Sequence, residues 1–404
     1  MRYLIIFLLA LTILSCKDEK KSEKLEVGTY RAVLEVQDNE ELPFIFEVTS
    51  DSTLTIFNAE EKIEVNEIEY KNDSIYIKTP VFEGYIAAIL NDGNLKGSFI
   101  KESLDRVVPF SAEFENDRRF ELKTKPSQNV SGIWETVFSK GIAGDEYIAK
   151  GIFKQEGDKV TGTFRTTTGD YRYLEGIMDG DTMKLSTFDG AHAFLFTAKV
   201  KDSTLEGHFY SGNHWKEPFV AKRNDAYALP NANDLTFLKE GYETLEFSFP
   251  DEDGNMVSLK DDRYNGKVVI VQIMGTWCPN CLDESKYYTK FYQANAERGV
   301  EIVALAFEYA KTEDKAFNSI ARLRKKLDIA YPILLAQYGT SDKAKAQEKL
   351  PMLNHILSYP TSIFIDKTAK VRKIHTGFDG PATGEKYTQF KSDFEGFVAE
   401  LLAE

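Results

Sequence analysis

From residue 25 to about residue 114, apolar and polar positions alternate over short stretches that are separated by turn signals. The alternating stretches lie at residues 30–36, 44–48, 54–57 and 74–77. Alternation with a period of two predicts strands with one buried face. No stretch of this region has the longer apolar period of a helix. We therefore expect an all-β unit over residues 27–116, called β unit 1 below.

The same pattern recurs over residues 130–223, called β unit 2. Three landmarks occur in both units in the same order, about 104 to 110 positions apart. They are the pairs Gly28 and Gly132, Gly97 and Gly207, and Pro109 and Pro218. This recurrence predicts an internal duplication, in which each copy forms a small up-and-down barrel or both copies form one sandwich. Trp134 is expected to plug one end of a packed barrel rather than to line a ligand site.

After a linker predicted at residues 224–240, the pattern changes. Buried strands are expected at residues 268–273, 301–307, 333–335 and 359–366. Helices are expected between them, one ending near Glu297 and others at residues 312–327 and 341–350, with a last helix from Glu385. Alternating strands and helices over residues 241–404 predict an α/β domain. The chain is thus expected to be multidomain, with an all-β N-terminal part and an α/β C-terminal domain.

Composition narrows the possible partners and cofactors. The 404-residue chain has a formal net charge of −14 and no basic run, which argues against nucleic acid. It contains three cysteines, Cys16, Cys278 and Cys281, so a structural disulfide would have to use the last two. Three histidines of β unit 2 have no carboxylate or cysteine cluster at ligand spacing. We therefore expect neither a metal nor a cofactor.

The first residues predict export and a lipid anchor. The apolar run at residues 3–14 follows Arg2 and is shorter than the roughly 20 residues of a membrane span, so residues 1–15 suit a signal peptide. Ile-Leu-Ser-Cys at residues 13–16 resembles a bacterial lipobox, which makes Cys16 the expected lipidation site; an ordinary secretory signal is the alternative. Residues 16–26 are charged and predict a solvated tether. We expect a location in the bacterial cell envelope, facing the periplasm or exposed on the surface.

Cys278 and Cys281 stand at the expected start of a helix that follows a buried strand. Two thiols three positions apart across the first turn of a helix are close enough to form a disulfide, and the helix N-terminus stabilises the thiolate of the first. The pattern predicts redox chemistry, with Cys278 as nucleophile and Cys281 as resolving thiol. The alternative is a zinc half-site, which would need a second pair of ligands, and no further cysteine remains in the domain.

Further motifs accompany the cysteine pair. In chain order they are Asp251-x-Asp-Gly254, Val257-Ser-Leu259, Gly266-Lys267, Trp277-Cys-x-x-Cys281, Glu284 and Tyr359-Pro360-Thr361. In this order they resemble the TlpA/ResA-like thioredoxin-fold proteins, over about residues 235–404. One position departs from the family: Pro279 follows the first cysteine, whereas many relatives carry a proline just before the second, where Asn280 stands here. A family redox potential therefore cannot be carried over.

The resemblance implies that one acidic side chain assists the thiols. Glu284 shares a helical face with Cys281 and is implied to tune the thiols or to move protons. The alternative is an acid of the first helical turn that the helix dipole stabilises. Glu308 follows the strand at residues 301–307 and is a further candidate to point toward the site.

The resemblance also implies a substrate-binding edge. Pro360 is implied to have a cis peptide bond and to face the cysteines, exposing the backbone of Tyr359 for pairing with an extended substrate. Thr361 completes this motif. Trp277 is expected to pack beside the cysteines and to shape the access groove.

We therefore expect an exported, membrane-anchored thiol–disulfide oxidoreductase that reduces protein disulfides through Cys278 and Cys281. Its partners would be a disulfide-containing protein, a dithiol electron donor in the envelope and the membrane, through Cys16. The sequence allows the oxidising direction equally. One alternative is a peroxiredoxin-like enzyme that reduces peroxide, although Thr276 is two residues before Cys278 rather than three. Another is a cell-envelope binding protein whose β units capture a ligand.

Overall fold

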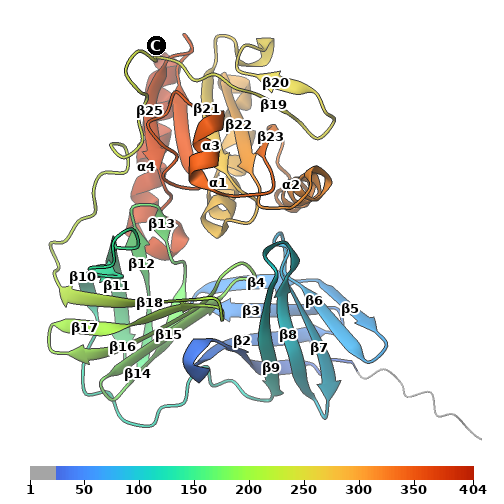
Figure 1. Cartoon of the computed structure of the whole chain (residues 1–404), viewed down its shortest axis with the longest axis vertical. Coiled ribbons are helices and arrows are strands. Elements are labelled where there is room, and N and C mark those ends of the chain that lie inside the picture. The colour runs from blue at the N-terminus through green and yellow to red at the C-terminus, as the bar shows by residue number, and fades with distance from the viewer. Residues whose placement is uncertain (1–23) are drawn as a thin grey trace, which may run out of the picture.

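The computed structural model describes residues 24–404, which form an all-β part and an α/β domain above it (Figure 1). The predicted signal peptide, the lipidation site Cys16 and the tether up to residue 23 lie outside the described residues. Among residues 24–404, no helix is both long and apolar enough to cross a membrane.

β unit 1 is an antiparallel sheet with the strand order β4-β3-β2-β1-β9-β8-β7-β6-β5. Its strands are β1 (Gly28–Glu35), β2 (Glu41–Ser50), β3 (Thr53–Asn58), β4 (Glu61–Val65), β5 (Glu67–Lys71), β6 (Ser74–Lys78), β7 (Tyr85–Asn91), β8 (Asn94–Lys101) and β9 (Arg106–Phe114). In β3 and β6 every second side chain is buried, as the period of two requires. The first strand pairs with the last, whereas β4 and β5 are the two edges, so this sheet remains open.

β unit 2 closes into a barrel because β11 pairs with both β10 and β12. Its strands are β10 (Gly132–Phe138), β11 (Tyr147–Glu156), β12 (Lys159–Thr166), β13 (Gly169–Asp170), β14 (Leu174–Asp179), β15 (Thr182–Phe188), β16 (Ala193–Lys201), β17 (Thr204–Ser211) and β18 (Trp215–Arg223). Aromatic rings such as Phe138, Phe164 and Phe196 fill its core. Trp134 is fully buried there, and its Nε1 donates to the carbonyl oxygen of Val130 (2.8 Å). This tryptophan fills the barrel, as expected.

The two β units share buried contacts. Phe188, at the end of β15, stacks on Phe44 of β2 with ring centroids 4.3 Å apart and belongs to the core of β unit 1. Asn58 of β3 is fully buried, and its side chain bonds both the carbonyl oxygen (2.9 Å) and the N–H (3.1 Å) of Phe188. The N-terminal part is therefore one continuous β body rather than two independent barrels.

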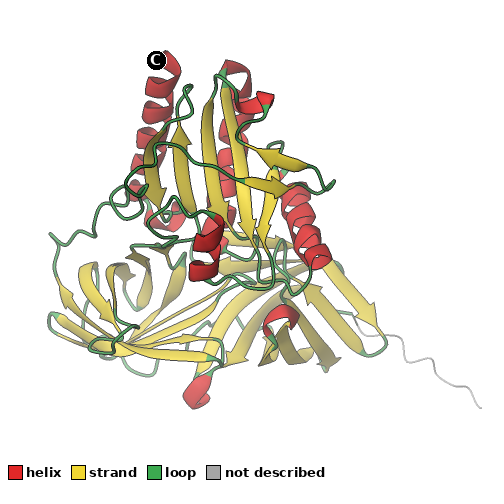
Figure 2. Cartoon of the chain, turned by 45° about the horizontal axis from the view of Figure 1, so that its top comes forward, coloured by secondary structure: helices red, strands yellow, loops and turns green. Residues whose placement is uncertain are grey.

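The C-terminal domain contains a five-stranded sheet in the order β23-β22-β21-β24-β25, in which β21, β22 and β23 are parallel (Figure 2). The strands are β21 (Val268–Met274), β22 (Val300–Phe307), β23 (Ile333–Gln337), β24 (Thr361–Ile365) and β25 (Val371–Thr376). The helices are α1 (Pro279–Asn295), α2 (Glu313–Leu327), α3 (Lys343–Lys349) and α4 (Glu385–Ala403). Every residue of β21 and β22 is buried, as expected for central strands covered on both faces.

Most element boundaries in this domain lie close to those predicted. α4 begins at Glu385, as expected, and its buried face consists of Phe390, Phe394, Val398 and Leu401. α1 ends at Asn295, slightly before the expected end, because the chain tightens into a 3-10 turn that Gly299 closes with a positive φ of 92°. Before the sheet, β19 (Ser248–Pro250) and β20 (Met256–Ser258) form a short antiparallel hairpin.

Part of the predicted linker is fixed to the α/β domain. Leu238 forms a β-bridge with Leu353, and the N–H of Thr376 donates to the carbonyl oxygen of Ala232 (2.9 Å). Thr236 is buried, and its hydroxyl accepts a hydrogen bond from that of Thr376 (2.8 Å). This segment therefore packs along the domain that follows it.

Candidate active site

The loop between β21 and α1 places the two cysteines. Cys278 is the N-cap of α1 and has extended backbone angles, and Pro279 occupies the start of the helix. A proline fits there because its missing N–H would have no partner within the helix. Cys281 follows within the first turn, so the strand, turn and helix lie as the sequence predicts.

Both cysteines are free thiols, and both are buried: 6% of Cys278 and 0% of Cys281 is exposed. The N–H of Cys281 donates to Sγ of Cys278 (3.2 Å), and that thiol donates to the carbonyl oxygen of Tyr359 (3.4 Å). Negative charge on Sγ of Cys278 is stabilised by this N–H and by the helix N-terminus. Burial raises the pKa of Cys281, and its neighbour Cys278 raises it further. Burial therefore favours the protonated form of the second thiol, while the backbone N–H and the helix start lie at the first.

The loop before β24 lies against the cysteines. The Tyr359–Pro360 peptide bond is cis, as the resemblance implies. The ring of Tyr359 lies edge-on to that of Trp277, with centroids 5.5 Å apart. Thr361 is fully buried, and its hydroxyl donates to the carbonyl oxygen of Ser358 (2.8 Å). Trp277, Tyr359 and Pro360 thus gather at the site, and Thr361 braces the loop from inside.

Glu284 lies fully buried in α1, one helical turn beyond Cys281. Its carboxylate accepts hydrogen bonds from Gln272 Nε2 (2.8 Å) and from the hydroxyls of Ser362 (2.9 Å) and Tyr288 (3.2 Å). Burial raises the pKa of Glu284 to about 7, although these hydrogen bonds favour the charged form. A carboxyl group with this pKa can exchange a proton near neutral pH.

Glu308 holds the loop that precedes the cysteines. It follows β22 directly, is buried, and accepts hydrogen bonds from the N–H (2.7 Å) and the hydroxyl (2.8 Å) of Thr276. Burial raises its pKa to about 7. Next to it, Nε1 of Trp277 donates to the carbonyl oxygen of Phe307 (2.9 Å). The end of β22 thereby fixes the loop that leads into Cys278.

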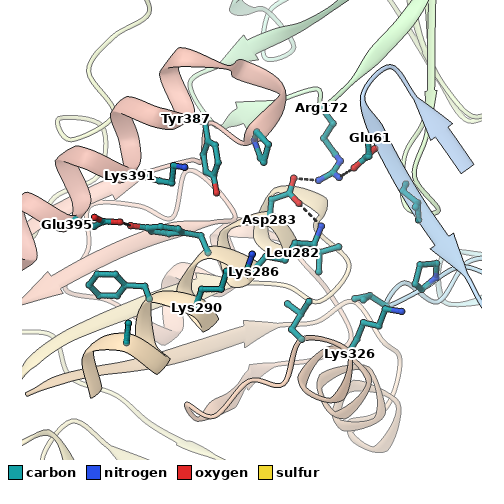
Figure 3. Close-up of a pocket in the computed structure, with 18 of the residues that line it drawn as sticks. Glu61, Arg172, Leu282, Asp283, Lys286, Lys290, Lys326, Tyr387, Lys391 and Glu395 are labelled. Carbon is teal, nitrogen blue, oxygen red and sulfur yellow. Dashed lines mark hydrogen bonds and ion pairs between the residues drawn. The ribbon is translucent and has the colours of Figure 1, made fainter. Parts of the chain in front are cut away.

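A buried arginine of β unit 2 joins this site to the β body (Figure 3). Arg172 forms ion pairs with Glu61 of β4 and Asp283 of α1, and its Nε lies 3.2 Å from a carboxylate oxygen of Asp189. Its Nη1 also donates to the carbonyl oxygen of Pro279, between the two cysteines (3.1 Å). A buried charge requires several partners, and these come from all three parts of the chain. Arg172 therefore fixes the β body against the start of α1.

Beside this cluster lies a cavity of about 970 Å³ between α1, α4 and the β body (Figure 3). Its lining combines apolar side chains of α1 and α4 with lysines on several elements: Lys62, Lys286, Lys290, Lys326 and Lys391. Within residues 24–404, no three or more His, Cys, Asp or Glu side chains are grouped to hold a metal ion.

The sequence did not reveal Arg172 or Asp283 as part of this site. An isolated arginine in a strand-rich region usually lies at the surface, so its type carries no signal of burial. Asp283 stands two residues after Cys281, and that proximity was the one available indication. The sequence could not show that the β body docks onto α1, because Arg172 and Asp283 are 111 positions apart and no local pattern links them.

Comparisons with known proteins match the C-terminal domain. Residues 239–389 match the protein family described as Redoxin. A thiol-disulfide oxidoreductase ResA of Bacillus cereus (strain ZK) is 31% identical over 164 residues, which cover 41% of this chain and 79% of that protein. The ResA of Bacillus thuringiensis subsp. konkukian (strain 97-27) is 30% identical over 134 residues, which cover 33% of this chain and 68% of that protein. A crystal structure of a thiol:disulfide interchange protein from Chlorobium tepidum TLS is 22% identical, covers 41% of this chain and 98% of that one, and has a TM-score of 0.31.

Proposed function

This chain belongs to the ResA-like thiol-disulfide oxidoreductases, and from that premise we propose that it reduces protein disulfides in the bacterial cell envelope through Cys278 and Cys281. The observation that carries the proposal is the free dithiol at the start of α1. The N–H of the second cysteine points at the sulfur of the first, 3.2 Å away, where a thiolate is stabilised.

The reaction consists of two exchanges. The thiolate of Cys278 attacks one sulfur of the substrate disulfide, whose S–S bond breaks, and the other substrate sulfur leaves as a thiolate that takes up a proton. A mixed disulfide then joins the substrate to Cys278. The thiolate of Cys281 attacks Sγ of Cys278, which breaks the mixed disulfide and releases the second substrate thiol. Two electrons have passed to the substrate, and a dithiol donor in the envelope returns them to the Cys278–Cys281 disulfide by the reverse exchanges.

Glu284 takes the proton of Cys281 in the second exchange. Cys281 is fully buried, and burial raises its pKa, so an internal acceptor is needed. The pKa of Glu284 is about 7, and the hydrogen bonds that it accepts from Gln272 and Ser362 fix its carboxylate on α1, one turn beyond Cys281. Its contribution is to deprotonate the resolving thiol at neutral pH.

The backbone next to Pro360 receives the substrate. The carbonyl oxygen of Tyr359 lies 3.4 Å from Sγ of Cys278, so an extended segment that pairs with this backbone brings its disulfide to the nucleophile. Trp277 lies beside this backbone, with its ring edge-on to that of Tyr359. Thr361 holds the loop in place with its hydrogen bond to Ser358.

The proposal includes a lipid anchor at Cys16. The lipobox-like residues 13–16 and the charged tether at residues 16–26 support it. Acyl chains contribute about 0.8 kcal/mol per buried methylene, so several chains hold a protein on a membrane. Cys16→Ser should move the protein from the membrane fraction to the soluble fraction of bacterial cells. Unchanged membrane association would contradict this anchor.

We also propose that the chain divides at residues 27–116, 130–223 and 241–404, and that the two β units are copies of one another. Gly97 of β8 stands opposite Ala88 and Phe110, and Gly207 of β17 stands opposite Ala198 and Phe219. In both units the first strand pairs with the last. The same residue types at the same register positions support a duplication.

The other expected functions have less support. In a peroxidase the threonine would act on the reactive cysteine, whereas the hydroxyl of Thr276 donates to Glu308 (2.8 Å). Ligand capture inside the barrel of β unit 2 would need space that Trp134 and its aromatic neighbours fill.

The test of the proposed function is the reduction of insulin by the chain from residue 24 onward, with dithiothreitol as electron donor. We expect catalytic turnover by the unaltered chain and none by Cys278→Ser. Equal rates for the two proteins would overturn the proposal.

A further inference from the structure

The turn between β12 and β13, residues 166–170, reaches from β unit 2 toward the α/β domain (Figure 1). We call it the β12–β13 turn. The carbonyl oxygen of Thr168 accepts a hydrogen bond from the hydroxyl of Ser358 (2.7 Å), the residue before Tyr359. The carbonyl oxygen of Asp170 accepts a hydrogen bond from Nδ2 of Asn280 (3.1 Å), which stands between the two cysteines in the sequence. The turn is therefore bonded both to the loop that carries the cis bond and to the Cys-x-x-Cys segment.

The β12–β13 turn is in close contact with Asn280 and with Gly377, which follows β25. A Cβ atom added to Gly169 would overlap with Nδ2 of Asn280. A Cβ atom added to Gly377 would lie 2.8 Å from the carbonyl carbon of Thr168, and the N–H of Gly377 donates to the carbonyl oxygen of Pro360 (2.9 Å). Both glycines have a positive φ, 140° and 79°. Little space therefore remains between the turn and either Asn280 or Gly377, and Gly377 is itself bonded to Pro360.

Charged groups hold the turn in this position. Nε and Nη2 of Arg165 donate to the two carboxylate oxygens of Asp379, at 2.6 Å and 2.7 Å. These side chains are only 13% and 15% exposed, so the pair is largely shielded from water. A carboxylate oxygen of Asp170 also accepts the N–H of Gly380 (2.6 Å). The contacts anchor both ends of the turn to the α/β domain.

We propose that the β12–β13 turn determines which disulfides reach Cys278, an inference that rests on the proposed function. The turn occupies one flank of the edge where an extended substrate would pair, and only 6% of Cys278 remains exposed. A low-molecular-weight disulfide, or one on a thin flexible segment, reaches the sulfur past the seated turn. A disulfide embedded in a folded protein reaches the sulfur only when the turn leaves the loop, so it reacts more slowly. The seated form therefore prefers substrates of the first class.

The experiment compares two substrates. The variant Arg165→Ala/Asp379→Ala removes both members of the shielded ion pair and leaves no unpaired charge behind. The matched control is Lys199→Ala/Asp181→Ala, an exposed pair of the same β unit (2.5 Å). With dithiothreitol as donor, the rates with insulin and with glutathione disulfide are measured for each protein.

Loss of the ion pair should raise the ratio of the insulin rate to the glutathione disulfide rate about five- to thirtyfold, the factor that corresponds to a loss of about 1–2 kcal/mol. The control pair should leave the ratio within about twofold of the unaltered chain, as expected for an exposed pair. A ratio that stays the same in both variants would overturn the inference.

A second readout does not depend on turnover. In a Cys281→Ser background, Cys278 is alkylated with iodoacetamide or with a maleimide on a long polyethylene glycol, and the ratio of the two rates is compared with that of the urea-unfolded chain. In the folded chain we expect the maleimide to react much more slowly, relative to iodoacetamide, than in the unfolded chain. Removal of the ion pair should bring the ratio of the two rates closer to that of the unfolded chain. If neither disulfide is reduced by any form, the proposed function fails, and the alkylation ratio still decides the role of the turn.

Discussion

Replacing Glu284 with glutamine should weaken the pH dependence of the stability of the reduced protein. The carboxyl group is fully buried, and burial raises its pKa from 4.5 to about 7. The folded state therefore binds this proton more tightly than the unfolded state does. The favourable contribution is complete below about pH 4.5 and is lost as the pH rises to about 7. The shift corresponds to about 3 kcal/mol of unfolding free energy.

Glu284→Gln keeps the size of the side chain and one carbonyl oxygen for the hydroxyls of Ser362 and Tyr288, but it does not titrate. Urea unfolding of both proteins would be measured at about pH 4.5 and about pH 8, with the thiols kept reduced. The unaltered chain should lose about 3 kcal/mol more unfolding free energy than the variant when the pH rises from about 4.5 to about 8. Comparing changes cancels any cost of the substitution that does not depend on pH.

The matched control is Glu400→Gln, which alters an exposed acid of α4 that keeps its contact with water. It should leave the pH dependence as it is in the unaltered chain. If Glu284→Gln also leaves it unchanged, Glu284 ionises as readily in the folded chain as in the unfolded one. That result would refute the argument from burial and, with it, the proposed proton transfer from Cys281.

Three further substitutions test other parts of the account. Cys281→Ser should arrest the reaction at the first exchange, so a covalent adduct of Cys278 with the substrate should accumulate and be seen by mass spectrometry; rapid release of the substrate would contradict the assigned order of attack. Arg172→Ala should lower the unfolding free energy by about 3–5 kcal/mol because it leaves buried carboxylates unpaired, and a loss below about 1 kcal/mol would show that the cluster is hydrated. Trp134→Ala should cost about 3–5 kcal/mol in the unfolding of the β body without changing the reduction potential of the cysteines, whereas a changed potential would mean that the barrel core acts on the site.

The thioredoxin-like fold and the family expected from the motifs are confirmed by the comparisons. The α/β domain was predictable because its signals are local: a fully apolar stretch such as β21 and the periodic face of α4 are each visible within one element. The position of Cys278 at the N-cap was predictable for the same reason, since the preceding strand and the following helix define it.

Long-range contacts were not predictable in this way. The sequence indicated β strands, but it did not show that β unit 1 stays open while β unit 2 closes, because closure depends on the pairing of β11 with β12. It gave no sign that Arg172 is buried or that Ser358 bonds Thr168, 190 positions away. Those contacts arise where the β body docks onto the α/β domain, and such contacts produce no apolar periodicity in the sequence of either partner.

The most direct test of the central claim is the equilibrium reduction potential of the Cys278–Cys281 pair, measured in the chain from residue 24 onward against dithiothreitol or glutathione buffers. A disulfide reductase should give a two-electron transition near the value of thioredoxin, about −270 mV. A value near about −120 mV, typical of a strong disulfide oxidant, would reverse the proposed direction of electron flow. The absence of any transition would contradict redox chemistry at this pair.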